Sequence, residues 1–329
     1  MFIGFSCIHS VEKKACGSTV IRFLDFNNRS TMVSVIVSVT LFGIGLLTGI
    51  LLQKYYPIGR LLRTTGIIAR GAPGRLPMPV AHERIEVPIS ILPSQRVMVA
   101  LIFGQSNSAN FGASSRAAGK KVYNFYRGKL YAAQDPLLGA DGNGGSVWTR
   151  LGDRIIREDL YDAVVFISLG VGGTSLGRWK SDGDLHARII DAIHELRTKR
   201  LTITHLLWHQ GEQDALLKTT KDEYKKMFLD MLSNIRQQGV NAPIYVSIAT
   251  TCGELEQGNR EIQQAQRELV DRSKGIYAGP NTDLLGFAYR YDGCHFSDEG
   301  LEYAASLWLH SLNPSPLRAS VQSTGSLTE

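Results

Sequence analysis

The stretch VMVALIFGQSN, residues 97–107, combines the pattern of a buried strand with a reactive side chain just beyond it. Seven apolar residues, rich in branched side chains and followed by Gly104, have the length of such a strand and a glycine at the position where it ends. In open α/β sheets ligands bind beyond the carboxyl ends of the strands. Gly104 lets the backbone turn sharply and is expected to leave room for a substrate. Ser106 is therefore a candidate nucleophile, the alternative being a serine that only caps a turn.

Two later stretches carry side chains that complete such a site. LLWHQGEQD, residues 206–214, has the pattern of a second apolar strand that ends in a polar turn containing glycine. Asp292 and His295 are separated by two residues and precede a helix start. Serine-dependent acyl transfer needs a nucleophile, a base that takes its proton, and a carboxylate that orients the base. His295 is a better candidate base than His209, because Asp292 lies beside it in the same loop.

Four short blocks together resemble the SGNH (GDSL-like) hydrolase superfamily. They are G-Q-S-N at 104–107, G-G-T-S at 172–175, W-H-Q-G-E at 208–212 and D-x-x-H at 292–295. Within the superfamily they are similar to the branch of sialate O-acetylesterases and carbohydrate esterase family 6 acetylxylan esterases. That branch has glutamine where most of the superfamily has asparagine. The resemblance implies a flavodoxin-like, three-layer α/β/α sandwich and a carbohydrate O-acetylesterase activity.

The resemblance also implies a catalytic triad of Ser106, Asp292 and His295. His295 would accept the Ser106 proton, and Asp292 would hold the imidazole and stabilise its cation. This division of roles is the same as in other serine hydrolases.

The glycine-rich and amide-bearing loops supply the other groups of the implied site. Glycines at 170–173 allow a backbone N–H to point into the crevice, a role that the resemblance gives to Gly173, with Gly172 as the rival. The oxyanion hole would then comprise the N–H groups of Ser106 and Gly173 and the side chain of Gln210. A surface position for the Glu212 carboxylate fits the pattern as well as a place in the pocket. The residues expected to line the substrate pocket are Gln105, Asn107, Trp208 and Glu212.

Apolar segments alternate in type along residues 96–312, which we interpret as one esterase domain. The expected strands are 97–103, 163–169, 203–209, 244–250 and 275–278. The expected helices are 146–159, 185–199, 224–238, 262–272 and 299–312. Such alternation implies right-handed crossovers and a sheet of about five parallel strands covered by helices on both faces. The pattern therefore predicts the same α/β architecture as the resemblance.

The segment between the candidate nucleophile and the first expected helix, residues 110–145, is where we expect substrate specificity to reside. Its aromatic side chains fit two roles, stacking on sugar rings or packing the segment onto the domain. They are Tyr123, Phe125, Tyr126 and Tyr131.

Segments outside the domain have distinct compositions. Residues 32–52 contain no charged residue and are long enough to cross a hydrocarbon core of about 30 Å as a helix, which predicts a single transmembrane anchor. A cleaved signal peptide and a buried core helix are the alternatives. Residues 1–31 precede the anchor, residues 53–95 have the proline and arginine content of an extended stalk, and residues 313–329 have the composition of a disordered tail.

The distribution of charged residues bears on the orientation of the expected anchor and on nucleic-acid binding. Basic residues flank the expected anchor on both sides, so the positive-inside rule does not orient it. The substrates of the resembled branch favour an exoplasmic or lumenal catalytic domain, whereas a start at Met32 would favour a cytoplasmic one. The net charge of +6 is spread along the chain without the aromatic-interleaved basic patch of a nucleic-acid binder.

Cysteine and histidine spacing argues against metal catalysis. The four cysteines show no C-x-x-C motif and the histidines no H-E-x-x-H motif, so no metal or other cofactor is expected. Cys252 and Cys294 each follow an expected strand and are compatible with a disulfide in an oxidising compartment or with two free thiols.

Together these features predict a membrane-anchored serine esterase that removes O-acetyl groups from carbohydrate through an acyl-enzyme. The expected partners are an acetylated carbohydrate and the membrane. An O-acyltransferase would use the same site with a sugar in place of water as acceptor. A carbohydrate-binding module without catalysis is the third alternative, and intact Ser106, Asp292 and His295 argue against it.

Overall fold

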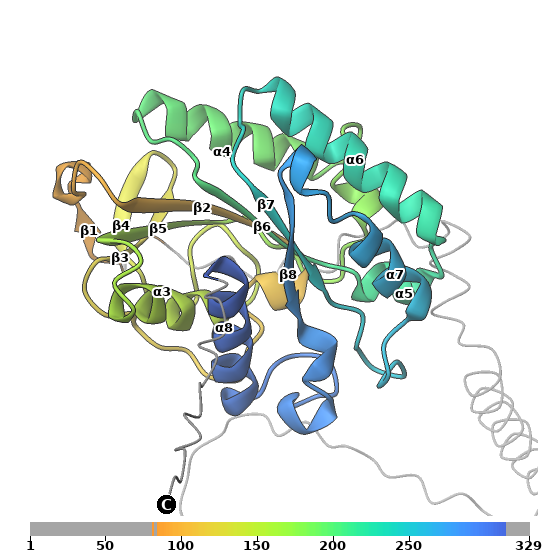
Figure 1. The fold of residues 1–329 in the computed structure, drawn as a ribbon. Helices are drawn as coiled ribbons and strands as arrows, with labels where there is room; N and C mark the ends of the chain where they lie inside the picture. The colour runs from red at the N-terminus through yellow and green to blue at the C-terminus, as the bar shows by residue number, and fades with distance from the viewer. Residues whose placement is uncertain (1–80, 82–83, 314–329) are drawn as a thin grey trace, which may run out of the picture. The chain divides into compact units, whose positions relative to one another are not determined.

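A single eight-stranded sheet lies between two layers of helices (Figure 1). The computed structural model describes residue 81 and residues 84–313. The strands are β1 Glu86–Val87, β2 Val97–Gly104, β3 Val122–Tyr126, β4 Lys129–Ala132, β5 Ala163–Ser168, β6 His205–His209, β7 Ile244–Ile248 and β8 Ile276–Asn281. The α-helices are α3 Val147–Arg157, α4 His186–Thr198, α5 Glu212–Leu217, α6 Lys221–Gln237, α7 Arg260–Glu268 and α8 Asp298–Leu312.

The apolar run of β2 explains the two helical layers. Odd-numbered residues from Val99 to Phe103 pack in one core cluster with α4, α6 and α7. Even-numbered residues from Met98 to Ile102 pack in a second cluster with α3 and α8. Successive side chains of a strand point to opposite faces of the sheet, so a strand that is apolar throughout must be covered on both faces. Figure 1 shows these helices on the two sides of the sheet.

The order of the strands places the site. The sheet order is β1-β4-β3-β5-β2-β6-β7-β8, and the pairs from β3 to β8 are parallel. With β1 and the β3–β4 hairpin set aside, the remaining five strands, numbered in chain order, follow 2-1-3-4-5, the order of flavodoxin-like sheets. The chain therefore leaves β2 toward β5 on one side and returns to β6 on the other. The carboxyl ends of β2 and β6 flank the switch point, where such sheets bind ligands.

All five expected strands and all five expected helices are confirmed within a few residues at their ends, and the structure adds three strands. Two of these, β3 and β4, form an antiparallel hairpin within residues 110–145. Their aromatic residues Tyr123, Phe125 and Tyr131 are buried, so for these three the packing role is the one confirmed. The Arg127-Gly128 turn between the strands has positive φ at both positions, as in a type I′ hairpin.

The amino-terminal boundary of the folded domain lies earlier in the chain than predicted. β1 pairs antiparallel with β4, and Val87, Ile89 and Leu92 pack against the core. The last part of the segment interpreted as a stalk therefore belongs to the domain, because its apolar residues cover the edge that β4 presents. Within residues 84–313 no helix is both long enough and apolar enough to cross a membrane. The predicted anchor at 32–52, the segment 1–31 and the tail beyond residue 313 lie outside the described residues and stay predictions.

Candidate active site

Ser106 begins a single 3₁₀ turn, Ser106–Ser108, directly after β2. Gly104 has φ +131°, and a Cβ there would lie 2.1 Å from the carbonyl oxygen of His209 in β6. Glycine is thus required because the backbones of β2 and β6 approach closely, and not to leave room for a substrate as expected. Ser106 is 4 % exposed and lines a cavity of about 270 Å³.

His295 lines the same cavity and is paired with Asp292. The distance from Nδ1 of His295 to Oδ2 of Asp292 is 2.6 Å. Oδ1 of Asp292 accepts the backbone N–H groups of Cys294 and His295 at 2.9 and 2.7 Å. Partial burial alone would raise the pKa of Asp292, but hydrogen bonds from His295 and Cys294 outweigh it and lower the pKa below its ordinary value. An ionised Asp292 therefore holds the imidazole by Nδ1 and leaves Nε2 to exchange a proton.

Two aromatic rings flank the imidazole of His295. The ring centroid of Phe111 lies 5.2 Å from that of His295 in a stacked geometry, and that of Tyr291 lies 6.1 Å away, also stacked. The Tyr291 hydroxyl donates a hydrogen bond to the carbonyl oxygen of Phe111 at 3.1 Å. Packing of this kind limits rotation of the ring and keeps it in the plane set by Asp292.

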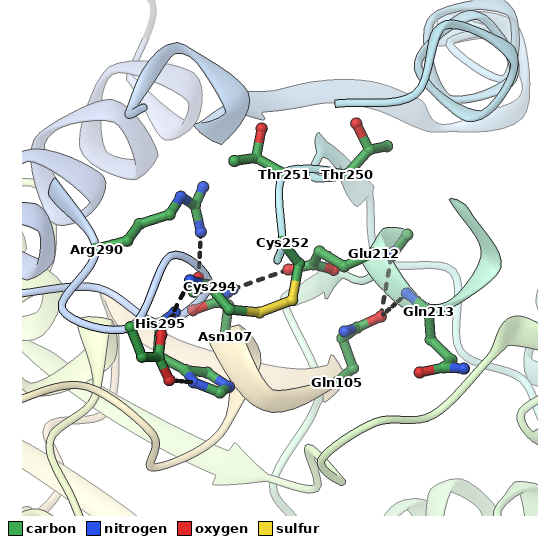
Figure 2. The surroundings of a disulfide bond; sticks show 12 residues. Gln105, Asn107, Glu212, Gln213, Thr250, Thr251, Cys252, Arg290, Cys294 and His295 are labelled. Carbon is green, nitrogen blue, oxygen red and sulfur yellow. Dashed lines mark hydrogen bonds and ion pairs between the residues drawn. A yellow bond between two sulfur atoms is a disulfide. The ribbon is translucent and has the colours of Figure 1, made fainter. Parts of the chain in front are cut away.

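The two glutamines of the motifs lie at different depths. Oε1 of Gln105 accepts the backbone N–H groups of Gln213 at 3.0 Å and Gly211 at 3.4 Å and a hydrogen bond from Nε2 of Gln210 at 3.3 Å. Nε2 of Gln105 donates to none of the described residues. Gln105 lines the cavity, and in Figure 2 its amide nitrogen points away from Gln213. Gln210 is fully buried and does not line the cavity, because its Nε2 donates to the carbonyl of Thr174 and to Asp214. This geometry does not support the prediction that Gln210 completes the oxyanion hole, and the side-chain amides that line the cavity are those of Gln105 and Gln213.

Gly173 is exposed and has free space around its Cα. Its φ is +64°, and a Cβ there would meet no atom within 4 Å. A Cβ at Gly172 would instead lie 2.8 Å from the ring of Phe111, so that position is closed by packing. Both glycines line the cavity together with Ser106. The choice of Gly173 over Gly172 as the backbone donor to an oxyanion stays a prediction, because these Cβ distances describe space and not the direction of an N–H group.

Glu212 is buried in the wall of the cavity and not on the surface. Its Oε1 accepts a hydrogen bond from Nδ2 of Asn107 at 2.8 Å, and its Oε2 is buried without a hydrogen-bond partner. Burial raises the pKa of Glu212 to about 7, against the opposing effects of the Asn107 hydrogen bond and the charge of Arg290. The carboxyl group therefore keeps its proton to higher pH than an exposed glutamate does.

Asn107 joins the nucleophile turn to the histidine loop. Its Nδ2 also lies 3.2 Å from the carbonyl oxygen of Cys294, which Nη1 of Arg290 contacts as well (Figure 2). A disulfide joins Cys294 to Cys252, so the structure has the bonded alternative of the two that the sequence allowed. Both half-cystines line the cavity. The loop that carries His295 is thus tied by a covalent bond to the loop that follows β7.

Trp208 and His209 do not reach the cavity, although Trp208 was expected to line it. The Trp208 indole packs 5.0 Å from the ring of Phe103, and its Nε1 donates to the Tyr224 hydroxyl on the opposite side of the sheet from α3 and α8. His209 is fully buried near Phe296, and burial lowers its pKa to about 3. A histidine that stays neutral and shielded from the cavity is not the base, in agreement with the choice of His295.

Four residues that no motif indicated also line the cavity, and they come from different parts of the chain. They are Phe111, Asp141, Gln213 and Leu216. Gln213 and Leu216 belong to α5, which begins directly after the W-H-Q-G block. Among residues 84–313 no three His, Cys, Asp or Glu side chains gather in a way that would hold a metal ion.

The raised pKa of Glu212 makes stability depend on pH. The unfolded chain ionises this carboxyl near 4.5, whereas the folded protein keeps the proton until about pH 7. Between pH 4.5 and about pH 7 the folded state holds this proton and the unfolded chain does not. The free energy that the proton contributes to stability is therefore fully present below pH 4.5 and is lost as pH rises to about 7. At 1.36 kcal/mol per pKa unit the loss is at most about 3 kcal/mol.

The Glu212→Gln variant removes this titration. Its melting temperature relative to wild type should rise from about pH 5 to about pH 7, because only the wild type loses stability there. Asp283 and Arg290 contribute to the potential at Glu212 in both proteins, so the difference isolates its carboxyl. A difference that stays constant over this range would show that Glu212 titrates near its ordinary value.

Comparison with known proteins adds a family and a set of folds. The family model described as "Carbohydrate esterase, sialic acid-specific acetylesterase" matches residues 96–303, more than half of the chain. Among curated proteins, no sequence matches.

Solved structures resemble the chain at low sequence identity. A protein from Arabidopsis thaliana is 17% identical with a TM-score of 0.52, over 66% of this chain and 95% of its own. NanS is 14% identical with a TM-score of 0.49, over 67% and 98%. A GDSL-like lipase from Parabacteroides merdae is 15% identical with a TM-score of 0.45, over 65% and 94%. At this identity the likeness to the first of them shows a shared fold.

Proposed function

The chain belongs to the carbohydrate esterase family of sialic acid-specific acetylesterases, and we propose that it removes O-acetyl groups from carbohydrate with Ser106, His295 and Asp292 as its triad. Membership makes the protein a carboxylic ester hydrolase of the SGNH type. The observation that carries the proposed triad is the 2.6 Å contact of His295 with Asp292 at the cavity that Ser106 lines. A nucleophile, a base and an orienting carboxylate are the three groups that serine acyl transfer requires.

The first half-reaction transfers the acetyl group to the enzyme. Oγ of Ser106 attacks the acetyl carbonyl carbon while Nε2 of His295 takes the hydroxyl proton. Asp292 stabilises the imidazolium that results. The carbonyl oxygen becomes an oxyanion, which accepts hydrogen bonds from the backbone N–H groups of Ser106 and Gly173 and from Nε2 of Gln105. When the intermediate collapses, the bond to the sugar oxygen breaks and His295 gives its proton to the departing hydroxyl.

The second half-reaction regenerates the serine. Water loses a proton to His295 and attacks the acetyl carbon of acetyl-Ser106. The same donors stabilise the second oxyanion. Collapse breaks the bond to Oγ of Ser106, which recovers a proton from His295, and acetic acid leaves. The disulfide beside His295 supports the retention of this geometry through both steps, because it restricts the loop that carries the base.

The Gln105→Glu variant tests the amide donor. Glutamate keeps an oxygen acceptor for the N–H groups of Gly211 and Gln213 but replaces the donor Nε2 with a negatively charged oxygen. Loss of one oxyanion donor costs about 10²–10³ in kcat, and the added charge should bring the loss to the upper end of that range. The measurement is kcat for 4-nitrophenyl acetate.

Gln237→Glu is the matched control for Gln105→Glu, since Gln237 is exposed at the end of α6. It makes the same chemical change away from the cavity and should leave kcat as in the wild type. If kcat of Gln105→Glu stays within about threefold of the wild-type value, Gln105 is not a donor of the oxyanion hole.

Product analysis tests hydrolysis against acyl transfer. The full chain is incubated with acetylated xylooligosaccharide, with and without an excess of unacetylated acceptor sugar. The proposal expects acetate and deacetylated sugar in equal molar amounts in both cases, because water is the acyl acceptor. Acetate release that falls as acetylated acceptor accumulates would instead identify an O-acyltransferase.

The compartment is a further part of the proposal. We place the catalytic domain on the exoplasmic or lumenal side of a membrane, with residues 32–52 as the anchor. The Cys252–Cys294 disulfide supports this side, since disulfides persist mainly in oxidising compartments. In sealed microsomal vesicles the domain should resist added protease until detergent is present. Digestion without detergent would place it on the cytoplasmic side.

A further inference from the structure

The side-chain amide of Asn107 connects three segments around Ser106 (Figure 2). Its Nδ2 donates to Oε1 of Glu212 at 2.8 Å and to the carbonyl oxygen of Cys294 at 3.2 Å. A side-chain amide has two N–H groups, so both hydrogen bonds form at once. The 3₁₀ turn that begins at Ser106 is thereby joined to α5 and to the loop that carries His295.

The register of the sheet brings Asn107 and Glu212 together. Gly104 in β2 and His209 in β6 are paired residues at the carboxyl ends of their strands. Asn107 and Glu212 each lie three residues beyond this pair, and both are buried. A hydrogen bond shielded from water is electrostatically stronger than one at the surface. The contact therefore ties together the loops that follow the two strands at the switch point.

The peptide bond between Cys294 and His295 is held at both of its polar groups. Its N–H donates to Oδ1 of Asp292 at 2.7 Å. Its carbonyl oxygen accepts hydrogen bonds from Nδ2 of Asn107 and Nη1 of Arg290. Arg290 and Asp292 belong to the same segment of the chain as His295, whereas Asn107 comes from the nucleophile turn. Asn107 therefore sets where this loop lies relative to the nucleophile.

Glu212 supplies the acceptor that orients Asn107. If the asparagine amide rotated by half a turn, its Oδ1 would face Oε1 of Glu212, and neither oxygen would have a proton to donate. Oε2 of Glu212 is buried without a hydrogen-bond partner among the described residues, so the contact to Asn107 is made by Oε1 alone. Burial of a carboxyl group costs free energy and raises the pKa of Glu212 to about 7. Sequences accept such a cost mainly at functional sites.

We propose that Glu212 is a positioning residue, which through Asn107 holds Ser106 in place relative to His295 for proton transfer. This inference rests on the proposed esterase function, in which Nε2 of His295 takes the proton of Ser106. A displacement of about 1 Å in such a site costs about 10²-fold in rate. Loss of the link should therefore lower kcat much more than it changes KM.

The Glu212→Ala variant removes the acceptor. We expect kcat for 4-nitrophenyl acetate to fall about 10²-fold and KM to change by less than about threefold. Glu261→Ala is the matched control, because Glu261 lies in the first turn of α7 as Glu212 does in α5, but is exposed. It should keep the wild-type kcat. A Glu212→Ala enzyme with wild-type kcat, or with a loss that appears in KM alone, would overturn the proposal.

The Glu212→Gln variant separates the acceptor from the charge. Glutamine keeps a carbonyl oxygen that accepts from Asn107, and it replaces Oε2, which has no partner within residues 84–313. We expect its kcat to exceed that of Glu212→Ala at least about tenfold. Equal losses in the two variants would show that kcat does not depend on the hydrogen bond to Asn107, and would overturn the role assigned to Glu212.

A double-variant cycle tests whether Glu212 acts through Asn107. Asn107→Ala should lower kcat at least as much as Glu212→Ala, because it removes both hydrogen bonds of the amide. The enzyme with both changes should be no more than about threefold slower than Asn107→Ala, since residues that act as a unit are not additive. Losses that multiply would mean that the two residues act independently, against the proposal. Where Glu212→Ala does not fold, a wild-type kcat in Asn107→Ala would overturn it.

The Ser106→Ala variant distinguishes a failure of this inference from a failure of the proposed function. Turnover of 4-nitrophenyl acetate that is lost in Ser106→Ala but unchanged in Glu212→Ala would leave the esterase intact and refute the positioning role. No turnover by folded wild type would refute the proposed function itself. Circular dichroism and melting temperature of each variant show whether a loss of kcat is a loss of fold.

Discussion

Replacing Ser106 with alanine is expected to lower kcat for acetyl ester hydrolysis at least about 10⁴-fold, with the fold intact. The hydroxyl is the only group of Ser106 that the proposed chemistry consumes, and alanine keeps the backbone N–H of the oxyanion hole. The side chain of Ser106 makes no hydrogen bond to any described residue, so its removal should not change stability through a lost hydrogen bond. The measurement is kcat on 4-nitrophenyl acetate, with circular dichroism and melting temperature as checks of folding.

Two comparisons make the Ser106 result specific. Ser233→Ala, at an exposed position of α6, should leave kcat unchanged. The double variant Ser106→Ala with His295→Ala should be no slower than Ser106→Ala alone, because residues of one triad act as a unit. A Ser106→Ala enzyme with a tenth or more of wild-type kcat would show that another group attacks the ester.

Replacing Asp292 with asparagine is expected to lower kcat by about 10²–10⁴-fold, with a smaller effect on KM. The asparagine Oδ1 can still accept the backbone N–H groups of Cys294 and His295, so the loop keeps its shape. What is lost is the charge that stabilises the imidazolium and the acceptor that fixes the proton on Nδ1 of His295. The measurement is kcat and KM over a range of pH.

Asp298→Asn is the control for Asp292→Asn. Asp298 is exposed in the first turn of α8, six residues further along, and it lines no part of the cavity. Its loss should cost a few tenths of a kcal/mol of stability through the helix dipole, at about 0.3–1 kcal/mol per charge, and nothing in kcat. Equal effects of the two variants would mean that Asp292 acts on the loop and not on the base.

The residues of the proposed triad could be selected from the sequence because local signals determine where they lie in the fold. Ser106 follows an uninterrupted apolar strand, and Asp292 and His295 lie in one loop, where the bond between them depends on residues three apart. The alternation of strands and helices then brings those loops to one edge of the sheet, since the carboxyl ends of parallel strands meet there. The same logic found five of the six parallel strands of the sheet and missed β3.

The wall of the cavity could not be placed from the sequence, because it depends on distant contacts. Gln210 turns inward because Asp214 and the carbonyl of Thr174 accept its amide hydrogens, and Thr174 lies 36 residues away in the sequence. Trp208 was expected in the pocket, but the strand alternation points its side chain into the core of α4 and α6. Asp141 lies in a glycine-containing loop without any motif, so its place in the wall emerges only from the fold.

The hairpin and the disulfide show two other limits of the sequence. β3 and β4 are short and are joined by Arg127-Gly128, which lacks the asparagine or aspartate that makes a type I′ turn easy to identify. Cys252 and Cys294 are 42 residues apart, and only the three-dimensional distance between them, 4.1 Å from Cα to Cα, decides between a bond and two thiols.

The most direct test of the account is to trap the acyl-enzyme. The full chain is mixed with 4-nitrophenyl acetate, quenched in acid within the first turnover, digested and examined by mass spectrometry for the peptide that contains Ser106. The account predicts one acetyl group on Ser106 in wild type, and a larger fraction in His295→Ala if residual acylation outpaces deacylation without the base. Turnover with no acetyl group on Ser106, and undiminished in Ser106→Ala, would contradict the claim that this serine is the nucleophile.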